Sequence, residues 1–266
     1  MSTFAPTPGP PGPGGLGASP NVAGACTSLD LVRCAGEEEV AKAAGELVLT
    51  SLRSAIERRG RAVWIPSTGR TVMGCYAFLV EHHRLALDWA RVEVFQMDEL
   101  ADVPKDQTAR HFPMHRLIEP LGIRRHMLMR DASSATAEGL ERALVAAVPD
   151  LVLHGIGENG HLGLNEPGTS FDSSGRAVTL NEETRRAVGA PGVWGRPPTY
   201  PVSRGSTLGL GALFAVPRSI LVATGARKRR ALHAALFLPA TPRLPASGLQ
   251  LYSTTTVIAD SAAFPD

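Results

Sequence analysis

Short apolar runs alternate with longer amphipathic segments along most of the chain. Residues 37–59 are typical of a helix, because apolar side chains recur every three to four positions and acidic residues occupy the first turn. Shorter patterns of the same kind predict helices at about 73–81, 137–147, 205–213 and 227–236. Apolar runs of three to six residues predict strands at 29–32, 61–65, 92–95, 151–153, 219–223 and 255–259.

Strands that alternate with helices indicate parallel β-α-β units joined by right-handed crossovers. We therefore expect an α/β fold with an open, mostly parallel β-sheet flanked by helices on both faces, a Rossmann-like arrangement of three layers. Ligands of such sheets bind beyond the carboxyl ends of the strands. The main polar clusters of this chain follow predicted strands, so we expect the functional site at that edge.

The first part of the chain differs in composition from the rest. Residues 1–25 are rich in proline, glycine, alanine and serine, which bury too little apolar area to offset the loss of chain entropy. We expect a disordered tail over 1–25 and a single α/β domain over 26–266. At 266 residues the chain is long enough for one large domain with its own core.

Composition excludes several classes of protein. The net charge of +2 favours neither a nucleic-acid partner nor a membrane surface, and no apolar run approaches the ~18 residues of a membrane span. The three cysteines form no C-x-x-C motif, which fits a reducing compartment. No secretory signal is evident, so we expect a cytoplasmic protein with a small-molecule substrate. The sequence is compatible with a homo-oligomer and with a monomer.

A glycine-rich turn with a histidine and a carboxylate follows the predicted strand at 151–153. Residues 155–167 read GIGENGHLGLNEP. His161 can move a proton near neutral pH, and Glu166 can orient it, while Asn165 and Pro167 shape the turn. The alternative is a histidine and an acid that satisfy each other locally. Glycines that allow close approach of a ligand, placed at a strand end, favour the active-site interpretation.

The same turn matches G-x-G-x-x-G at 155–160. A dinucleotide site of that pattern needs a long helix directly after it. Gly163 and Pro167 interrupt any such helix, so we do not expect a nicotinamide cofactor.

Two neighbouring carboxylates end the predicted strand at 92–95. Residues 95–99 read FQMDE, and a carboxylate at a strand end can serve as a general base. A cap for the next element is the alternative. Because Asp98 and Glu99 are direct neighbours, their side chains point in different directions, and we expect one to be functional and the other structural.

Two further loops between a strand and a helix resemble anion sites, because hydroxyls, glycine and free amides gather at a helix N-terminus. The alternative for the first loop is a plain connection between the strand and the helix. The alternative for the second loop is that its lysine is an ordinary surface residue. The candidate residues are Thr68, Gly69, Arg70 and Thr71 in the first loop and Lys228 in the second.

His111 and His115 have the spacing of metal ligands on a helix. Pro113 lies between them and no glutamate follows the first, so the zinc-protease pattern fails. We expect no metal.

Taken together, these loops resemble the glucosamine-6-phosphate deaminase/isomerase family. The family's glycine-rich turn and G-H-I-x-F-N-E-P sequence are closely matched at 155–167, and its F-N-M-D-E is matched at four of five positions at 95–99. Its T-G-x-T and T-G-x-x-K loops are similar to residues 68–71 and 224–228. The related phosphogluconolactonases share the fold but differ where Asn165-Glu-Pro167 stands, which favours the deaminase branch.

The resemblance implies aldose–ketose isomerisation coupled to loss of ammonia, giving fructose 6-phosphate. His161 would shuttle the proton that opens the sugar ring, supported by Asn159 and Glu166. Asp98 would take the C2 proton and return it to C1 through an enolamine. No metal or organic cofactor is implied, because positioned acid–base groups suffice for these proton transfers.

The chain also departs from the family pattern. Arg70 stands where a small residue is usual, Val72 replaces a proline, and the family's phosphate-binding arginine aligns near Ala190. Arg70 or Arg196 is a candidate to supply the lost charge, because a guanidinium binds phosphate in a bidentate manner. The alternative is a substrate without the usual phosphate, or one that carries it differently.

Two other functions on the same scaffold remain alternatives: a sugar-phosphate lactonase and a non-catalytic sugar-phosphate sensor. The presence of all four proton-transfer residues argues against the sensor, as does the lack of an evident helix-turn-helix segment. The basic residues that serve allostery in the family are only partly matched, with Arg176 present and Val178 not basic. We therefore expect no amino-sugar allostery.

Overall fold

The structure is a computed structural model that describes residues 28–101, 114–189, 202–252 and 254–265. The tail expected to be disordered, residues 1–25, lies outside the described residues.

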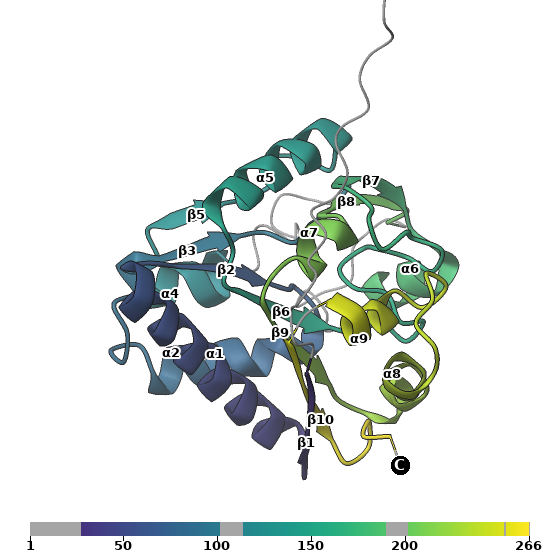
Figure 1. Cartoon of the computed structure of the whole chain (residues 1–266), viewed down its shortest axis with the longest axis horizontal. Helices are drawn as coiled ribbons and strands as arrows, with labels where there is room; N and C mark the ends of the chain where they lie inside the picture. The colour runs from purple at the N-terminus through teal and green to yellow at the C-terminus, as the bar shows by residue number, and fades with distance from the viewer. Residues whose placement is uncertain (1–27, 102–113, 190–201, 253, 266) are drawn as a thin grey trace, which may run out of the picture.

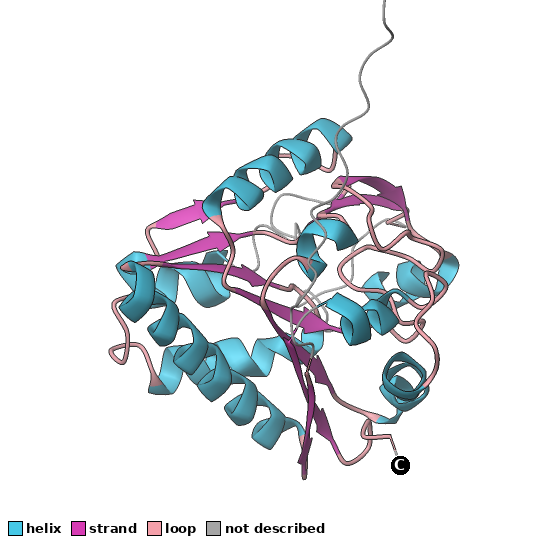
Figure 2. Ribbon diagram, viewed as in Figure 1, coloured by secondary structure: helices cyan, strands magenta, loops and turns pink. Residues whose placement is uncertain are grey.

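A seven-stranded sheet forms the centre of the molecule, and all its strand pairs are parallel (Figures 1 and 2). In spatial order the strands are β1 (Leu29–Cys34), β10 (Thr254–Asp260), β9 (Arg218–Ala223), β6 (Leu151–Gly155), β2 (Ala62–Pro66), β3 (Val92–Phe95) and β5 (Arg125–Met127). Each predicted strand overlaps one of these observed strands, whereas the edge strand β5 was not predicted.

Helices cover both faces of this sheet, as expected (Figure 1). One face packs against α1 (Glu37–Arg59), α2 (Met73–His82) and α4 (Glu119–Leu121). The other face packs against α5 (Ser134–Ala147), α7 (Leu210–Phe214), α8 (Arg229–Phe237) and α9 (Leu249–Tyr252). The three-layer α/β prediction is therefore confirmed.

The continuous apolar character of β6 follows from its central position. Leu151 and Leu153 belong to the hydrophobic cluster on one face, while Val152 belongs to the cluster on the other. A strand buried on both faces needs apolar residues at every position rather than at alternate ones. Because β6 is the central strand, the loop that follows it lies at the middle of the carboxyl edge of the sheet.

A smaller antiparallel sheet, which the sequence did not predict, lies beside the carboxyl edge of the large one. It consists of β4 (Asp98–Leu100), β8 (Arg204–Thr207) and β7 (Arg176–Thr179), with β8 in the centre. Leu100 and Leu164 pack under it in a small hydrophobic cluster. The helix α6 (Glu182–Gly189) follows β7 along the chain.

The helix predicted at 205–213 is wrong in its first half. Residues 204–207 form β8, and the helix begins only at Leu210. Backbone hydrogen bonding to β4 and β7 overrides the local apolar pattern there, as tertiary pairing commonly does. A Cβ at Gly205 would lie 2.6 Å from the backbone oxygen of Glu99, so the close approach of β4 requires glycine.

Candidate active site

Four strands that are neighbours in the large sheet, β9, β6, β2 and β3, end beside a single cavity of about 220 Å³. The loop after each strand contributes to its lining. Seven of the nine predicted site residues line this cavity: Thr68, Gly69, Arg70, Thr71, Asp98, His161 and Lys228. The other two, Asn159 and Glu166, bond to each other and reach His161 through the Asn159 side chain.

Asp98 faces the cavity from the first position of β4. Its carboxylate accepts a hydrogen bond of 2.9 Å from the Thr68 hydroxyl, and only 7% of the residue is exposed. Burial raises the pKa of Asp98 to about 6, and the nearby charge of Glu99 adds to this, while the Thr68 hydrogen bond acts in the opposite direction. A carboxylate poised in this range can accept a proton at neutral pH.

Glu99 does not line the cavity, and its carboxylate is engaged by neighbouring groups. Its carboxylate accepts hydrogen bonds from the Leu100 amide at 2.9 Å and from the Gln96 side chain at 3.2 Å. Gln96 also donates to the backbone oxygen of Asp98 and accepts from the Met129 amide. Of the two acids only Asp98 lines the cavity, which fits the expectation that one is functional and the other structural. Gln96 braces the connection between β3 and β4.

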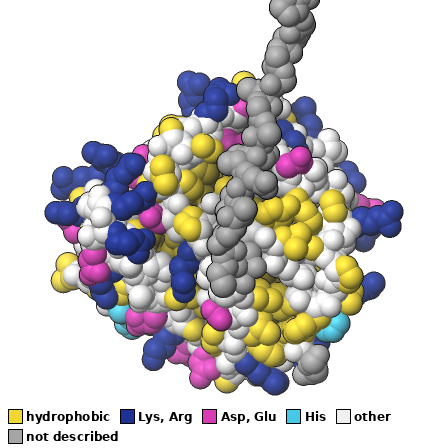
Figure 3. All heavy atoms as spheres, in the orientation of Figure 1, with side chains coloured by type: hydrophobic (Ala, Val, Ile, Leu, Met, Phe, Trp, Pro, Cys, Tyr) yellow, Lys and Arg dark blue, Asp and Glu magenta, His cyan; other side chains and the backbone are white. Residues whose placement is uncertain are grey.

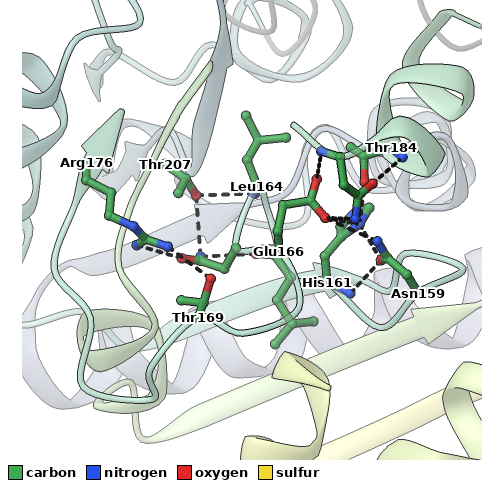
Figure 4. A network of polar contacts seen from close by, with 11 residues as sticks. Asn159, His161, Leu164, Glu166, Thr169, Arg176, Thr184 and Thr207 are labelled. Atoms are coloured by element: carbon green, nitrogen blue, oxygen red, sulfur yellow. Dashed lines mark hydrogen bonds and ion pairs between the residues drawn. The ribbon is translucent and has the colours of Figure 1, made fainter. Parts of the chain in front are cut away.

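His161 is held by a relay of polar side chains (Figure 4). Glu166 accepts a hydrogen bond of 3.1 Å from the Asn159 Nδ2, which fixes the orientation of that amide. The Asn159 Oδ1 therefore faces His161, 2.8 Å from its Nδ1. Because this oxygen can only accept, Nδ1 carries the hydrogen and Nε2 keeps its lone pair.

The charge state of His161 follows from the same surroundings. Burial lowers its pKa to about 4, and the positive charge of Lys228 contributes in the same direction. Its side chain is 18% exposed, and the Glu166 carboxylate lies 4.0 Å from Nδ1. The imidazole is consequently neutral at pH 7 and can act as a base through Nε2.

The glycines of the turn are required by close packing around the imidazole. A Cβ at Gly157 would lie 2.3 Å from ring atoms of His161, so only glycine fits beneath the ring. Gly160 has φ +83°, a left-handed conformation that glycine adopts without strain. The dense glycines noticed in the sequence therefore position the histidine.

Two residues at the start of α6 complete the relay, and the sequence reasoning missed both. Asn181 donates to Glu166 from its side chain at 2.8 Å and from its amide at 3.2 Å. The Thr184 hydroxyl lies 3.2 Å from the Nδ1 of His161, and its amide donates to the Asn181 side chain. An asparagine before Glu182-Glu183 is a typical N-cap, and that signal marks this helix start.

Asn165 shapes the turn, as predicted. Its side-chain amide donates to the backbone oxygens of Leu162 and Leu208, at 3.1 and 2.9 Å. Its side-chain oxygen accepts from Arg176 at 3.0 Å, and Arg176 also donates to Thr169 (Figure 4). The guanidinium of Arg176 is thus engaged within the loop that carries Glu166.

Part of the cavity lining is cationic. Arg70 from the loop after β2 and Arg227 and Lys228 from the loop after β9 all line it. Burial lowers the pKa of Lys228, and the positive charge of Arg70 lowers it further, whereas Glu158 opposes the shift. Arg70 and Lys228 therefore line the same cavity and are close enough for their charges to interact. Arg196 and Ala190 lie outside the described residues.

Within the described ranges, no group of three histidine, cysteine, aspartate or glutamate side chains has a metal-binding arrangement. His111 lies outside those ranges, and His115 is paired with Glu119 at 2.8 Å. In the same part of the chain, no helix is long and apolar enough to cross a membrane.

Curated relatives resemble this chain over most of its length. A glucosamine-6-phosphate deaminase of Streptomyces avermitilis is 32% identical over 234 residues, covering 84% of this chain and 88% of the relative. One of Bacillus velezensis is 31% identical over 248 residues, covering 88% and 98%.

Solved structures show the same fold. A monomeric glucosamine-6-phosphate deaminase superposes with a TM-score of 0.78 at 27% identity, covering 88% of this chain and 98% of the other. A 6-phosphogluconolactonase from Trypanosoma brucei gives a TM-score of 0.72 at 18% identity, covering 89% and 98%. At 18% identity, the similarity to the lactonase supports the fold alone.

The family model described as glucosamine-6-phosphate isomerases/6-phosphogluconolactonase matches residues 35–258, which is most of the chain and includes every cavity-lining loop. The chain belongs to this family of glucosamine-6-phosphate isomerases and 6-phosphogluconolactonases.

Proposed function

We propose that this protein is an amino-sugar-phosphate deaminase/isomerase that converts glucosamine 6-phosphate, or a related hexosamine phosphate, into fructose 6-phosphate and ammonia. The observation that carries the proposal is one cavity lined by Asp98, by a neutral His161 and by the cations Arg70 and Lys228. A base for a carbon acid, a proton shuttle and an anion-binding group are the three parts that this reaction needs.

Ring opening is assigned to His161. In the neutral imidazole, Nε2 accepts the proton of the anomeric hydroxyl and passes it to the ring oxygen as the bond between C1 and that oxygen breaks. Nδ1 keeps its own hydrogen, which points to Asn159. The negative charge of Glu166, transmitted through the Asn159 amide, stabilises the imidazolium that forms transiently.

Isomerisation and deamination are assigned to Asp98. The carboxylate removes the proton from C2 of the open chain, giving an enolamine, and returns a proton to C1. The resulting iminium carbon at C2 adds water and loses ammonia, so that one water is consumed for each ammonia released. A carboxylate with a raised pKa suits this work, because it is basic enough to accept the proton and still ionised at pH 7.

The phosphate is assigned to Lys228, Arg70 and the loop from Thr68 to Thr71. Arg70, in the loop after β2, offers a guanidinium that can bind a phosphate through two hydrogen bonds. The position that aligns with the family's phosphate-binding arginine is occupied in this chain by Ala190. Its influence on the pKa of Lys228 places the two cations within electrostatic reach of each other. We infer that Arg70 supplies the charge that the family obtains from another position.

The test is an assay of the purified full-length protein with glucosamine 6-phosphate. Ammonia and fructose 6-phosphate are expected in equal amounts, and the Asp98→Asn variant is expected to release neither while remaining folded. The substrate panel includes galactosamine 6-phosphate, unphosphorylated glucosamine and 6-phosphogluconolactone. Absence of ammonia from every hexosamine phosphate, with hydrolysis of the lactone or ligand binding alone, would overturn the proposal.

A further inference from the structure

A second cavity lies at the opposite edge of the sheet, where β2, β3 and β5 begin. Its volume is about 290 Å³, and four arginines and one glutamate supply its charged lining: Arg59, Arg61, Arg91, Arg125 and Glu93. In Figure 3, lysine and arginine side chains gather on the left of the molecule, which is where these three strands start in Figure 1. The proposed reaction uses none of these residues.

Two of the arginines are fixed in place by the protein. Arg59 and Arg61 donate hydrogen bonds to the backbone oxygens of Val148 and Ala147, at 3.1 and 3.0 Å. These oxygens lie at the end of α5, whose partial negative charge attracts cations. Arg59 is also paired with Asp150. Both guanidiniums are therefore held at the cavity, with part of their donor capacity already used.

The other two arginines retain donors for a ligand. Arg91 pairs with Asp88, but both side chains are more than half exposed, and such surface pairs are weak. Arg125 is the first residue of the edge strand β5, and within the described residues its guanidinium has no hydrogen bond or ion pair to another side chain or backbone group. Glu93 is the one carboxylate of the described lining, and it already binds Arg61 at 3.2 Å.

We propose that this cavity binds a small anion that carries more than one phosphate charge. Four guanidiniums and the three carboxylates paired with them leave a net positive charge around one concave site, and a bound polyanion neutralises that charge. A guanidinium fork also matches the oxygens of a phosphate in a bidentate manner. The volume is near the lower end of small-molecule sites, roughly 300–1,000 Å³.

The site is separate from the catalytic cavity. β2 and β3 begin beside the arginines and end beside Thr68 and Asp98, so the two cavities lie at opposite ends of the same strands. The proposal does not rest on the identity of the reaction, and a failure of the deaminase assay leaves it untouched.

The test is calorimetric titration of the full-length protein with inorganic pyrophosphate at physiological ionic strength. The double variant Arg91→Gln/Arg125→Gln removes the two arginines with free donors. The double variant Arg142→Gln/Arg230→Gln changes the net charge equally at exposed helix positions outside both cavities. Because the catalytic cavity also has cations in its lining, Lys228→Met serves to separate the two sites.

We expect the first double variant to bind pyrophosphate at least tenfold more weakly, while the charge-matched variant and Lys228→Met retain this binding. Thermal unfolding curves of all variants are expected to coincide with that of the original chain within a few degrees, because the substituted arginines are exposed. Unchanged affinity in the first double variant would overturn the proposal. So would complete loss of binding in Lys228→Met, or no detectable binding to the original chain.

Discussion

The Thr68 hydroxyl donates a hydrogen bond of 2.9 Å to the Asp98 carboxylate, joining the loop after β2 to the start of β4. Thr68 belongs to the loop proposed to bind phosphate, and Asp98 is the proposed base. Anchoring of the substrate and abstraction of its C2 proton are therefore linked through one contact, which also opposes the rise in the pKa of Asp98. A change at Thr68 should thus be visible in the pH dependence of the reaction.

The first prediction concerns that pH dependence. Asp98 must be ionised to accept a proton, and its pKa is about 6, so kcat/KM for glucosamine 6-phosphate should fall as the pH drops through about 6. Thr68→Val removes the hydrogen bond that lowers the pKa of Asp98, so the acidic limb should move to higher pH.

The measurement is a pH profile of kcat/KM from pH 4.5 to 8.5 for both proteins. The substrate phosphate also titrates near pH 6, but it is the same in both profiles, and only the enzyme differs. A limb that stays in place or moves to lower pH in Thr68→Val would contradict the assignment of Asp98.

The second prediction concerns stability. The pKa of Asp98 is raised on folding from about 3.8 to about 6, so the folded state disfavours its charge, and this cost grows as the pH rises from 3.8 to 6. Asp98→Asn removes the buried charge and keeps an oxygen that accepts from Thr68. At pH 7 we expect a gain on the order of 1–3 kcal/mol in the free energy of unfolding, together with loss of ammonia release.

Urea unfolding at pH 7 and pH 4.5 measures the gain, which should be smaller at the lower pH. Glu99→Gln is the matched control. It should retain activity within about tenfold but lower stability, because Glu99 accepts hydrogen bonds with both carboxylate oxygens. Equal loss of activity in the two variants would argue against separate roles for the two acids.

The third prediction tests the position of the imidazole. Gly157→Ala places a methyl group 2.3 Å from ring atoms of His161, so the ring must move. A displacement of about 1 Å at a catalytic group typically costs about 100-fold in rate, and we expect a loss of that order in kcat.

Gly139→Ala in α5 is the control for this substitution. The nearest atom to its new Cβ would be 3.9 Å away, and an alanine in a helix interior is slightly stabilising. Steady-state kinetics of both variants provide the comparison. Retention of full kcat in Gly157→Ala would show that the observed ring position is not required for catalysis.

The fourth prediction concerns recognition of the phosphate. Lys228→Met and Arg70→Gln should each reduce kcat/KM for glucosamine 6-phosphate by about 10- to 150-fold, the range expected for one charge-assisted hydrogen bond of about 1.5–3 kcal/mol. The loss should appear mainly as an increase in KM. Turnover of unphosphorylated glucosamine should change little in either variant, and equal losses for both sugars would contradict the assignment.

Much of the fold and of the candidate site follows from local sequence patterns. The alternation of apolar runs with amphipathic segments indicated a parallel sheet covered on both faces, and this is the observed fold. The loops that follow β9, β6, β2 and β3 could be singled out because parallel strands place their carboxyl ends at one edge. His161 and Asp98 line one cavity for that reason, although their catalytic roles stay predictions.

Other features depended on pairing between distant segments. The local apolar pattern predicted a helix from residue 205, yet residues 204–207 form a strand because β4 and β7 offer backbone partners on both sides. Asn181 and Thr184 join the site because α6 begins beside the turn that holds His161 and Glu166. The four arginines of the second cavity are separated by up to 66 residues in sequence, from Arg59 to Arg125.

The sequence by itself thus determined the class of fold and the residue types at each strand end, because periodicity and turn chemistry are local properties. Only the tertiary structure decided which nitrogen of His161 carries the hydrogen, which of Asp98 and Glu99 faces the cavity, and that arginines converge at the far edge. These outcomes depend on hydrogen bonds and packing between segments far apart in the chain, and local propensity carries no information about such contacts.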